Sequence, residues 1–304
     1  LAALRVIIQR NPLPFVTGTL CPALCRDKCA RAWYEESVDI RGVKLECAKA
    51  AFDELMEEIK PEKPAGRRVA VIGAGPAGLS CAFFLARAGC DVTIHEKSGS
   101  PGGLIRSAVP GFRILEEDLE RDVALCLKPG AKLRLNSEVM NLNSLREEGY
   151  DAIVLCVGAT AADPLRLKEG RAMEALEFLR KTKHAPHELP AAAHIAVVGG
   201  GNSAIDAARA ARRLAGVIKV SLVYRRTARY MPAAEEELEE ALAEGIEFLE
   251  LLSPVSWDGS ALQCRQMKLG EADKTGRLTA VETEELSAVP ADLVVAAIGE
   301  KPDA

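Results

Sequence analysis

The pattern of apolar and polar positions changes once along the chain, at a stretch rich in proline and glycine over residues 61–66. Before this stretch, apolar residues recur at helical spacing over Leu1–Gln9 and Lys44–Ile59. After it, short apolar runs alternate with helical patterns, which is the order of elements that builds a parallel sheet. We therefore expect a helical segment over residues 1–62, followed by an α/β part.

The α/β part contains one strand–helix–strand unit twice. The first copy is predicted over Arg68–Ile72, Pro76–Ala88 and Asp91–Glu96, and the second over His194–Val198, Asn202–Ala215 and Lys219–Tyr224. Further elements are expected as strands at Tyr150–Val157 and Ala291–Ile298, an acidic helix at Ala233–Ala243, and a hairpin of Gln263–Leu269 with Leu278–Glu284. The repetition predicts an α/β protein with two Rossmann-like nucleotide-binding domains.

A glycine-rich turn joins the first predicted strand to its helix. Gly73 permits the sharp turn, Gly75 lets the backbone approach a pyrophosphate, and Gly78 allows close packing of helix on strand. The helix opens at Pro76 and Ala77, where its free N–H groups and positive dipole end favour phosphate. Such a motif also occurs by chance in loops, but the surrounding strands and helix favour a dinucleotide site.

An acidic residue, Glu96, ends the second strand of this first unit, and Lys97 follows it. A carboxylate at this position can accept hydrogen bonds from ribose hydroxyls, which suits the unphosphorylated ribose of FAD. Gly102, Gly103 and Leu104 come shortly afterwards in a predicted loop. This loop is either a plain flexible turn or a second place where backbone approaches the cofactor, and the preceding motif favours the second interpretation.

The second unit repeats the small-residue spacing at Gly199, Gly201 and Ala204, with Asn202 and Ser203 between them. Alanine is compatible with the third small position of such a turn. The sequence therefore predicts a second dinucleotide site in the same chain.

The second unit ends in Arg225 and Arg226 in place of an acid. Guanidinium groups bind a 2′-phosphate through paired, charge-assisted hydrogen bonds, whereas a carboxylate would repel it. Two adjacent arginines are often a solvated surface pair, but their place after the motif favours phosphate contact and hence NADPH over NADH. Gly158 and Gly299, each after an apolar strand, are further candidates for cofactor contact.

Composition narrows the possible partners. The charged share of 27% and the formal net charge of -5 leave no broad basic field, so we expect no nucleic-acid partner. No apolar run approaches the roughly 18 residues of a membrane span, so we expect no membrane partner and a cytoplasmic location. Leu1 is expected to be an internal residue of a longer protein, because no initiator methionine precedes it.

The nine cysteines fall into two groups. Cys21, Cys25 and Cys29 are closely spaced, which in a reducing compartment favours metal binding over disulfides. Three thiolates are one short of an iron–sulfur cluster site, and Cys47 would be a fourth, although its helical position favours packing. Free loop thiols are the alternative. Reduced core thiols are expected at the scattered positions Cys81, Cys90, Cys126, Cys156 and Cys264.

Several motifs together resemble a known family. They are Asn11-Pro12-Leu13-Pro14, Cys21-Pro22, Gly102-Gly103-Leu104, Val109–Arg113, Gly199–Asp206, Tyr224-Arg225-Arg226 and Met231-Pro232-Ala233. This combination resembles the small (beta) subunit of NADPH-dependent glutamate synthase. Related chains include the N-terminal half of dihydropyrimidine dehydrogenase and flavin subunits proposed to belong to selenate reductases.

The resemblance implies a domain order and further cofactors. It implies an FAD-binding domain over residues 66–165, an inserted NADPH-binding domain over 166–285, and a return to the FAD domain over 286–304. It also implies that Cys21, Cys25 and Cys29 contribute to [4Fe-4S] clusters whose other ligands lie upstream of Leu1. Because the family continues beyond Ala304 to a Gly-Asp motif, the FAD site of this chain is expected to be incomplete.

These expectations point to an electron-input subunit or domain. NADPH would reduce FAD, and iron–sulfur clusters would pass electrons to a catalytic partner subunit or domain. Hydride transfer between two cofactors needs orientation rather than an acid or base, so no catalytic side chain is expected. A disulfide reductase would need a C-x-x-C pair, which the sequence lacks. A nucleotide-binding assembly or sensing module without turnover is the alternative.

Overall fold

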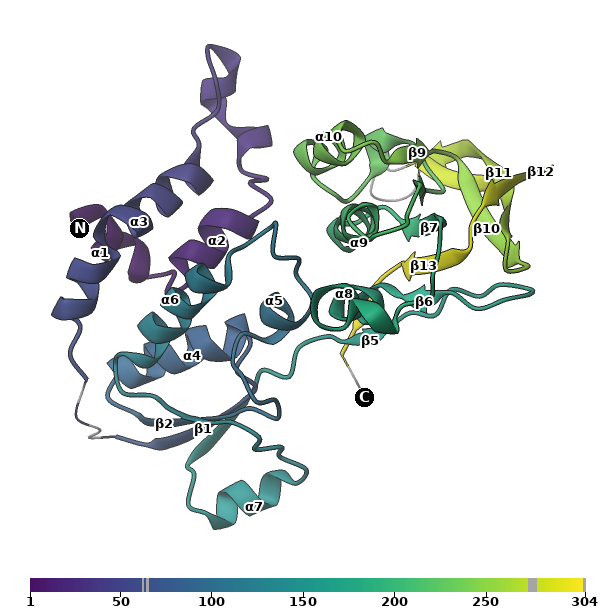
Figure 1. The fold of residues 1–304 in the computed structure, drawn as a ribbon. Coiled ribbons are helices and arrows are strands. Elements are labelled where there is room, and N and C mark those ends of the chain that lie inside the picture. Colours follow the sequence, from purple (N-terminus) through teal and green to yellow (C-terminus); the bar gives the residue numbers. More distant parts are fainter. Residues whose placement is uncertain (62, 64–65, 273–277, 303–304) are drawn as a thin grey trace. The chain divides into compact units, whose positions relative to one another are not determined.

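The computed structural model describes residues 1–61, 63, 66–272 and 278–302 (Figure 1). The chain folds into two compact units, Leu1–Gly158 and Ala159–Ala304. Each unit is built on a parallel sheet, and the α/β class with Rossmann-like domains is therefore confirmed. Among the described helices, none has both the length and the apolar character that a membrane crossing requires.

The sheet of the first unit has the strand order β3-β2-β1-β4, and all its pairs are parallel. Its strands are β1 (Arg68–Ile72), β2 (Asp91–His95), β3 (Lys132–Arg134) and β4 (Ala152–Leu155). Val69, Ala70 and Val71 of β1 are all buried, as expected for a central parallel strand that is covered on both faces. The helices of this sheet are α4 (Pro76–Arg87), α5 (Gly103–Ser107), α6 (Glu116–Leu127) and α7 (Leu142–Glu147).

The N-terminal helices belong to the same compact unit as this sheet. They are α1 (Ala2–Ile8), α2 (Pro14–Leu20) and α3 (Ile40–Glu58), with the 3-10 turns η1 (Arg26–Lys28) and η2 (Ala30–Trp33) between the last two. Leu4, Phe15 and Phe52 share one hydrophobic core with Phe83 of α4 and Leu125 of α6. Residues 1–62 were expected as a small helical cysteine-containing segment, and buried apolar side chains of its helices contribute to the core of the first unit.

A buried carboxylate fastens α2 to α6. Asp122 is fully buried, and its two oxygens accept hydrogen bonds from the N–H groups of Phe15 (3.2 Å) and Val16 (2.7 Å). Burial raises the pKa of Asp122 to about 7, although the two hydrogen bonds oppose that shift. Since the first turn of a helix has unpaired N–H groups, this carboxylate serves as a cap supplied from a distant part of the sequence.

The sheet of the second unit has the strand order β6-β13-β7-β8-β9, again fully parallel. Its strands are β6 (Met173–Glu174), β7 (His194–Gly199), β8 (Lys219–Val223), β9 (Glu247–Leu249) and β13 (Leu293–Ala297). Its helices are α8 (Ala175–His184), α9 (Asn202–Arg212) and α10 (Glu235–Ala243), with the 3-10 turns η3 (Pro186–Glu188) and η4 (Ala228–Tyr230). The predicted strand–helix–strand unit is thus present as β7, α9 and β8.

A three-stranded antiparallel sheet completes the second unit. It consists of β10 (Leu252–Trp257), β11 (Ala261–Ala272) and β12 (Leu278–Pro290), in that order. The hairpin expected from sequence corresponds to β11 and β12, which are longer than predicted, and β10 was not predicted. Leu262 and Val289 of this sheet share a core with Val198 and Val294 of the parallel sheet.

The expected return to the FAD domain over 286–304 covers the end of β12 and the strands β13 and β14. Strand β13 lies between β6 and β7, with Val295 in register with both Met173 and Val197. It is therefore part of the second sheet. Only after it does β14 (Glu300–Lys301) pair antiparallel with β5 (Ala161–Ala162), which was expected in the first part of the FAD domain. The residue at which the FAD domain resumes stays a prediction.

Candidate nucleotide-binding sites

Two glycines of the first turn are required by the packing of the protein itself. Gly73 has a φ of 102°, and a Cβ on it would lie 2.4 Å from the carbonyl oxygen of Cys156. A Cβ on Gly78 would lie 1.9 Å from the carbonyl oxygen of Gly73. Both distances are far below contact, so these positions exclude any side chain whether or not a ligand is bound.

Gly75 is different, because no close protein atom requires it to be glycine. An added Cβ would meet its nearest atom, the Cα of Gly103, at an ordinary 3.9 Å. Gly75 is the N-cap residue of α4, whose first helical residues are Pro76 and Ala77. The backbone therefore leaves open space beside a helix N-terminus, which is where a pyrophosphate needs close approach.

The second glycine loop of the first unit lies directly against this turn. The N–H of Gly102 donates a 2.8 Å hydrogen bond to the carbonyl oxygen of Ala74. Gly102 and Gly103 both have positive φ values, and a Cβ on Gly103 would come within 2.9 Å of the Cα of Gly75. Leu104 follows in α5 and is half-buried. The structure thus brings together two glycine segments that are separate in the sequence.

Glu96 holds the turn as well as ending β2. One carboxylate oxygen accepts a 2.7 Å hydrogen bond from the N–H of Ala74, and the other accepts from the N–H (2.9 Å) and hydroxyl (2.7 Å) of Ser98. Although burial opposes the charged form, these hydrogen bonds together lower the pKa of Glu96. They use three of about four acceptor positions and leave about one for a ribose hydroxyl. The next residue, Lys97, is exposed.

Gly158 lies at the same edge of the first sheet as the glycine turn. The N–H of Cys156 donates a 2.8 Å hydrogen bond to the carbonyl oxygen of Ile72, so the end of β4 runs beside the end of β1. Gly158 follows with a φ of 79° and no heavy atom within 4 Å of its Cβ position. The carboxyl ends of parallel strands are where α/β sheets bind ligands.

The glycines of the second turn also fall into two kinds, those that protein packing requires and one that it does not. A Cβ on Gly199 would lie 2.2 Å from the carbonyl oxygen of Ala297, and one on Gly200 would lie 2.4 Å from the ring of Tyr224. Gly201, the N-cap residue of α9, has no heavy atom within 4 Å of its Cβ position. Ala204 is fully buried. Gly201 thus corresponds to Gly75 as the open position beside a helix N-terminus.

One buried acceptor lies on this second turn. The side-chain oxygen of Asn202 is buried and has no hydrogen-bond partner among the residues that the structure describes. It is the first helical residue of α9, and half-buried Ser203 follows it. Because buried polar atoms in folded proteins nearly always have a partner, this oxygen fits a site that receives a donor from a bound molecule.

The two arginines predicted to read a 2′-phosphate occupy different environments. Arg225 is exposed, whereas Arg226 is half-buried and its Nε donates a 3.0 Å hydrogen bond to the carbonyl oxygen of Leu278 in β12. Arg226 therefore ties the stretch that follows β8 to the antiparallel sheet. Gly299 has a φ of 135°, and its carbonyl oxygen accepts a 3.0 Å hydrogen bond from the N–H of Asp163.

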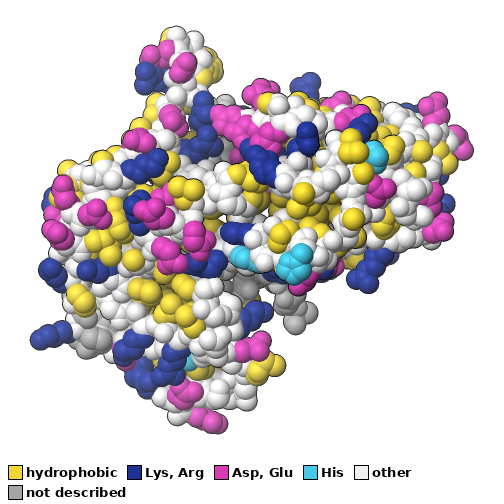
Figure 2. Space-filling view, in the orientation of Figure 1, with side chains coloured by type: hydrophobic (Ala, Val, Ile, Leu, Met, Phe, Trp, Pro, Cys, Tyr) yellow, Lys and Arg dark blue, Asp and Glu magenta, His cyan; other side chains and the backbone are white. Residues whose placement is uncertain are grey.

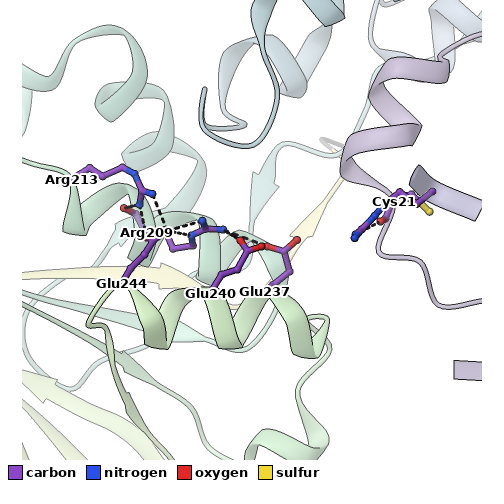
Figure 3. Close-up of polar contacts among 7 residues, drawn as sticks. Cys21, Arg209, Arg213, Glu237, Glu240 and Glu244 are labelled. Carbon is purple, nitrogen blue, oxygen red and sulfur yellow. Dashed lines mark hydrogen bonds and ion pairs between the residues drawn. The ribbon is translucent and has the colours of Figure 1, made fainter. Parts of the chain in front are cut away.

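An ion-pair network fastens α10 to α9, of which only the acidic helix was predicted from the sequence. Arg209, almost fully buried on α9, contacts Glu240 and Glu244 at 2.6 Å each and Glu237 at 3.7 Å (Figure 3). Arg213 and then Arg209 lower the pKa of Glu244 to about 2. Figure 2 shows acidic side chains gathered on the surface at α10, with basic ones directly beside them. The network therefore holds α10, which comes after the stretch that follows Arg225, against α9.

The three closely spaced cysteines lie around η1, in the stretch between α2 and α3. Cys21 follows α2, and its carbonyl oxygen accepts a 3.2 Å hydrogen bond from Arg41 (Figure 3). Cys25 is exposed and Cys29 half-buried, and backbone hydrogen bonds from Val38 and Arg31 lower the pKa of the Cys29 thiol. Within the described ranges, no three Cys, His, Asp or Glu side chains are grouped so as to hold a metal ion.

Four of the remaining cysteines have thiols with raised pKa values. Cys126 and Cys264 are buried, and burial raises the pKa of Cys264 to about 12 and that of Cys126 well above its usual value. Burial also raises the pKa values of Cys81 and Cys156. These thiols are protonated near neutral pH and pack as apolar groups, as the sequence predicted for the scattered cysteines.

Comparison with known proteins places the chain in a family. The profile of the family described as "Pyridine nucleotide-disulphide oxidoreductase" matches residues 67–304, which include both glycine turns. The chain belongs to this family. The stretch before residue 67, with the three cysteines, lies outside the match.

Relatives extend the similarity of this pyridine nucleotide-disulphide oxidoreductase to nearly the whole chain. The YgfK oxidoreductase of Escherichia coli (strain K12) is 38% identical and covers 99% of the chain. The beta subunit of an NADPH-Fe(3+) oxidoreductase from Geobacter sulfurreducens is 32% identical over 99% of the chain. The chain spans only 30% and 47% of these two relatives.

A third relative is the PreT subunit of the NAD-dependent dihydropyrimidine dehydrogenase of E. coli. It is 30% identical over 98% of the chain and 70% of its own length. The resemblance to glutamate synthase-type flavin subunits, which named dihydropyrimidine dehydrogenase as a related chain, is thereby confirmed.

Solved structures support the fold of this family member. FprA of Mycobacterium tuberculosis, in a complex with NADPH, superimposes with a TM-score of 0.67 at 22% identity, over 77% of this chain and 71% of its own. A thioredoxin reductase from T. acidophilum gives a TM-score of 0.55 at 19% identity, over 78% and 79%. At these identities, the likeness concerns the fold alone.

Proposed function

We propose that this chain binds FAD at the Gly73–Gly78 turn and NADPH at the Gly199–Ala204 turn, and passes a hydride from one to the other. The observation that carries the proposal is the matched pair of open positions at Gly75 and Gly201. Each lies at the N-terminus of a helix and is glycine without any need from protein packing. Two such positions in one chain suit two dinucleotides.

Flavin at the first turn is supported by the surroundings of Gly75. Glu96 keeps its carboxylate charged and has about one acceptor position left, which suits a ribose hydroxyl and disfavours a 2′-phosphate. Gly103 lies close enough to Gly75 that a second stretch of backbone would also reach the cofactor. Gly158 offers a further open approach at the same edge of the sheet.

Binding of NADPH at the second turn is supported by the sequence after β8, which has no carboxylate at the place where Glu96 follows β2. The equivalent strand end carries Arg225, which is exposed and has no hydrogen bond or ion pair within the described part of the chain. Its guanidinium would form charge-assisted hydrogen bonds with a 2′-phosphate. Asn202 would accept a hydrogen bond from the bound nucleotide through its buried, unpartnered oxygen.

The chain contributes binding and orientation to the reaction. Bound flavin supplies the capacity to accept a hydride and release electrons one at a time. The protein aligns the two cofactors and excludes water, and no side chain needs to exchange a proton at the nicotinamide. No acid, base or nucleophile is therefore assigned.

Electrons would leave the flavin through iron–sulfur clusters to a partner. Cys21, Cys25 and Cys29 would supply some [4Fe-4S] ligands, and the remainder would come from chain outside the described residues. The exposed loop and the lowered pKa of Cys29 suit thiolate ligands, because the thiolate is the form that binds metal. Relatives named as oxidoreductase and dehydrogenase subunits support a catalytic partner subunit or domain.

The domain order of a glutamate synthase small subunit is proposed for the whole protein. The nucleotide unit would be inserted into the FAD domain, entered near β5 and left near β14. The antiparallel pairing of these two short strands supports such an arrangement, because it brings entry and exit together. The chain after β14 would then complete the FAD site.

Disulfide reduction, the activity in the family's name, is not favoured for this member. That chemistry needs a thiol pair next to the flavin, and no C-x-x-C occurs in the sequence. Cys81 and Cys156 lie near the first turn, but burial raises both pKa values and so disfavours the reactive thiolate. A nucleotide-binding module without turnover is the remaining alternative.

A stopped-flow experiment separates turnover from binding alone. The flavin-loaded protein is mixed with NADPH without oxygen. The absorbance at about 450 nm, where an oxidised flavin absorbs, is then followed. Rapid bleaching is expected, with slower bleaching by NADH. Tight NADPH binding without any bleaching would refute the oxidoreductase proposal and leave the sensing module.

A further inference from the structure

The residue between the two turn glycines of the second site, Gly200, is glycine because of Tyr224. A Cβ on Gly200 would lie 2.4 to 2.9 Å from three atoms of the Tyr224 ring. Gly200 has no positive φ that would explain it otherwise. The ring therefore packs against the backbone of the turn that would carry the pyrophosphate, and Tyr224 itself is buried.

The hydroxyl of the same tyrosine closes the segment that carries Arg225. The Tyr224 hydroxyl donates a 2.8 Å hydrogen bond to the carbonyl oxygen of Tyr230. The other end of the segment returns to the same glycine, since the N–H of Ala233 donates a 3.1 Å hydrogen bond to the carbonyl oxygen of Gly200. We name residues 224–233 the arginine loop.

Backbone hydrogen bonds hold the start of the arginine loop to its sheets. The Tyr224 N–H donates to Leu249 (2.9 Å), and its carbonyl oxygen accepts from Leu252 (3.1 Å). The carbonyl oxygen of Arg226 accepts from Leu251 (3.3 Å). None of these bonds uses the side chain of Arg225. The loop is thus fixed around a residue whose guanidinium is exposed.

We propose that Tyr224 is a positioning residue that sets the distance between the pyrophosphate turn and the Arg225 guanidinium, and thereby the preference for a 2′-phosphorylated nucleotide. The inference rests on the proposed function of this site and adds the element that makes it selective. Its ring fixes one end of the distance at Gly200, and its hydroxyl fixes the loop at Tyr230. A nucleotide held at the turn would then find Arg225 at the place of its 2′-phosphate.

The first test removes only the hydroxyl, in the full chain. Tyr224→Phe is expected to weaken 2′,5′-ADP and NADP⁺ by about three- to tenfold in calorimetric titrations, the loss from one neutral hydrogen bond. Binding of NAD⁺ is expected to be unchanged, because that nucleotide has no group for Arg225. The matched control is Tyr150→Phe, which removes the hydroxyl of a similarly buried tyrosine near His95 in the first unit.

A double-mutant cycle shows whether Tyr224 acts through Arg225. In an Arg225→Ala background, Tyr224→Phe is expected to cause no further loss of 2′,5′-ADP affinity. A merely structural role would give the same loss in both backgrounds, and for NAD⁺ as well as NADP⁺. Either of these two results would overturn the inference.

A steric test uses the contact between ring and turn. Gly200→Ala alone is expected to weaken both nucleotides, because the new methyl forces the Tyr224 ring away. In a Tyr224→Ala background the same change is expected to have no effect, since the space is empty. Equal effects of Gly200→Ala in both backgrounds would contradict the contact. Melting curves and flavin content verify that each variant is folded.

The wild-type titration separates failure of the inference from failure of the proposed function. If the wild type binds 2′,5′-ADP and Tyr224→Phe binds it equally well, Tyr224 has no positioning role and the site assignment stands. If the wild type binds no 2′,5′-ADP, the NADPH assignment fails and the inference fails with it.

Discussion

The carboxylate of Glu96 accepts a 2.7 Å hydrogen bond from the backbone N–H of Ala74, so the end of β2 holds the glycine turn that follows β1. A residue selected in the sequence as a ribose ligand thus also shapes the site. Substitution at this position is expected to affect cofactor binding through both roles.

Glu96→Gln tests this double role. The amide keeps the shape but places an N–H₂ group where acceptors are needed, so we expect flavin affinity to fall by about tenfold or more, the scale of one hydrogen bond to a charged group. The flavin-to-protein ratio after gel filtration measures the loss. Glu147→Gln, at an exposed position of the same unit, is the control, and an equal loss there would contradict the role of Glu96.

The two open glycines are expected to give reciprocal phenotypes. Gly75→Val should place a side chain in the pyrophosphate position and give colourless protein, whereas Gly201→Val should stay yellow but resist reduction by NADPH. Absorbance spectra before and after NADPH addition distinguish them. Loss of flavin in Gly201→Val, with retention in Gly75→Val, would show that the two sites are assigned in reverse.

Gly78→Ala provides the structural counterpart to these substitutions. Its Cβ would lie 1.9 Å from the carbonyl oxygen of Gly73, so helix and strand must separate. We expect a marked fall in the melting temperature of the first unit, while Gly75→Ala, which meets only an ordinary contact, melts like the wild type. Calorimetric scans compare the two, and equal melting temperatures would contradict the distinction.

The two arginines are expected to differ in their effect on nucleotide preference. Arg225→Ala should weaken NADPH by about tenfold to about 150-fold, the worth of a hydrogen bond to a charged group, and leave NADH unchanged. Arg226→Ala removes a bond to Leu278 and should lower stability more than preference. Titrations with both nucleotides test this. An equal loss of NADPH and NADH in Arg225→Ala would exclude recognition of the 2′-phosphate.

The raised pKa of Asp122 predicts that the stability of the folded chain depends on pH. Its pKa is about 7 in the folded chain, and an unfolded aspartate has a pKa of about 3.9. Between those values the folded state binds a proton that the unfolded state lacks. The contribution of Asp122 to stability is therefore complete below about pH 4 and decreases until about pH 7. The slope of the unfolding free energy against pH should flatten in Asp122→Asn, and an unchanged slope would contradict the shifted pKa.

The three cysteines around η1 predict iron–sulfur clusters whose assembly needs ligands from residues before Leu1. A protein that includes the native residues before Leu1, prepared without oxygen, is expected to contain iron and acid-labile sulfide as well as flavin. Residues 1–304 alone should bind flavin at most. Iron and sulfide analysis of both proteins tests this. Flavin without sulfide in the longer protein would mean that Cys21, Cys25 and Cys29 are ordinary thiols.

The sequence predicted those parts of the sites that depend on local spacing. Gly73, Gly75 and Gly78 lie in one short motif, and a turn between strand and helix can be predicted from it. The hydrogen bonds of Asp122 to Phe15 and Val16 could not be predicted, because they join residues more than one hundred positions apart. Gly200 had no assigned role, because its constraint comes from the ring of Tyr224, which lies outside the glycine motif.

The sheet that strand β13 joins could not be predicted, because a buried parallel strand has the same apolar pattern in any α/β sheet. Nothing in the run Leu293–Ala297 itself says which sheet it joins, and only the register with β7 decides it. The family resemblance implies the order of the domains, and their boundaries stay a prediction.

Under the proposed domain order, the pairing of β5 with β14 would make the nucleotide unit a segment that can be exchanged as one piece. The stretch that leads into the unit and the stretch that leads out run side by side, with Ala162 opposite Glu300. A unit whose ends meet can be cut out, closed with a short linker or exchanged for another at little cost in loop entropy. Under that order, recombination between related proteins would change the electron donor through this pair of strands and leave the proposed flavin unit unchanged.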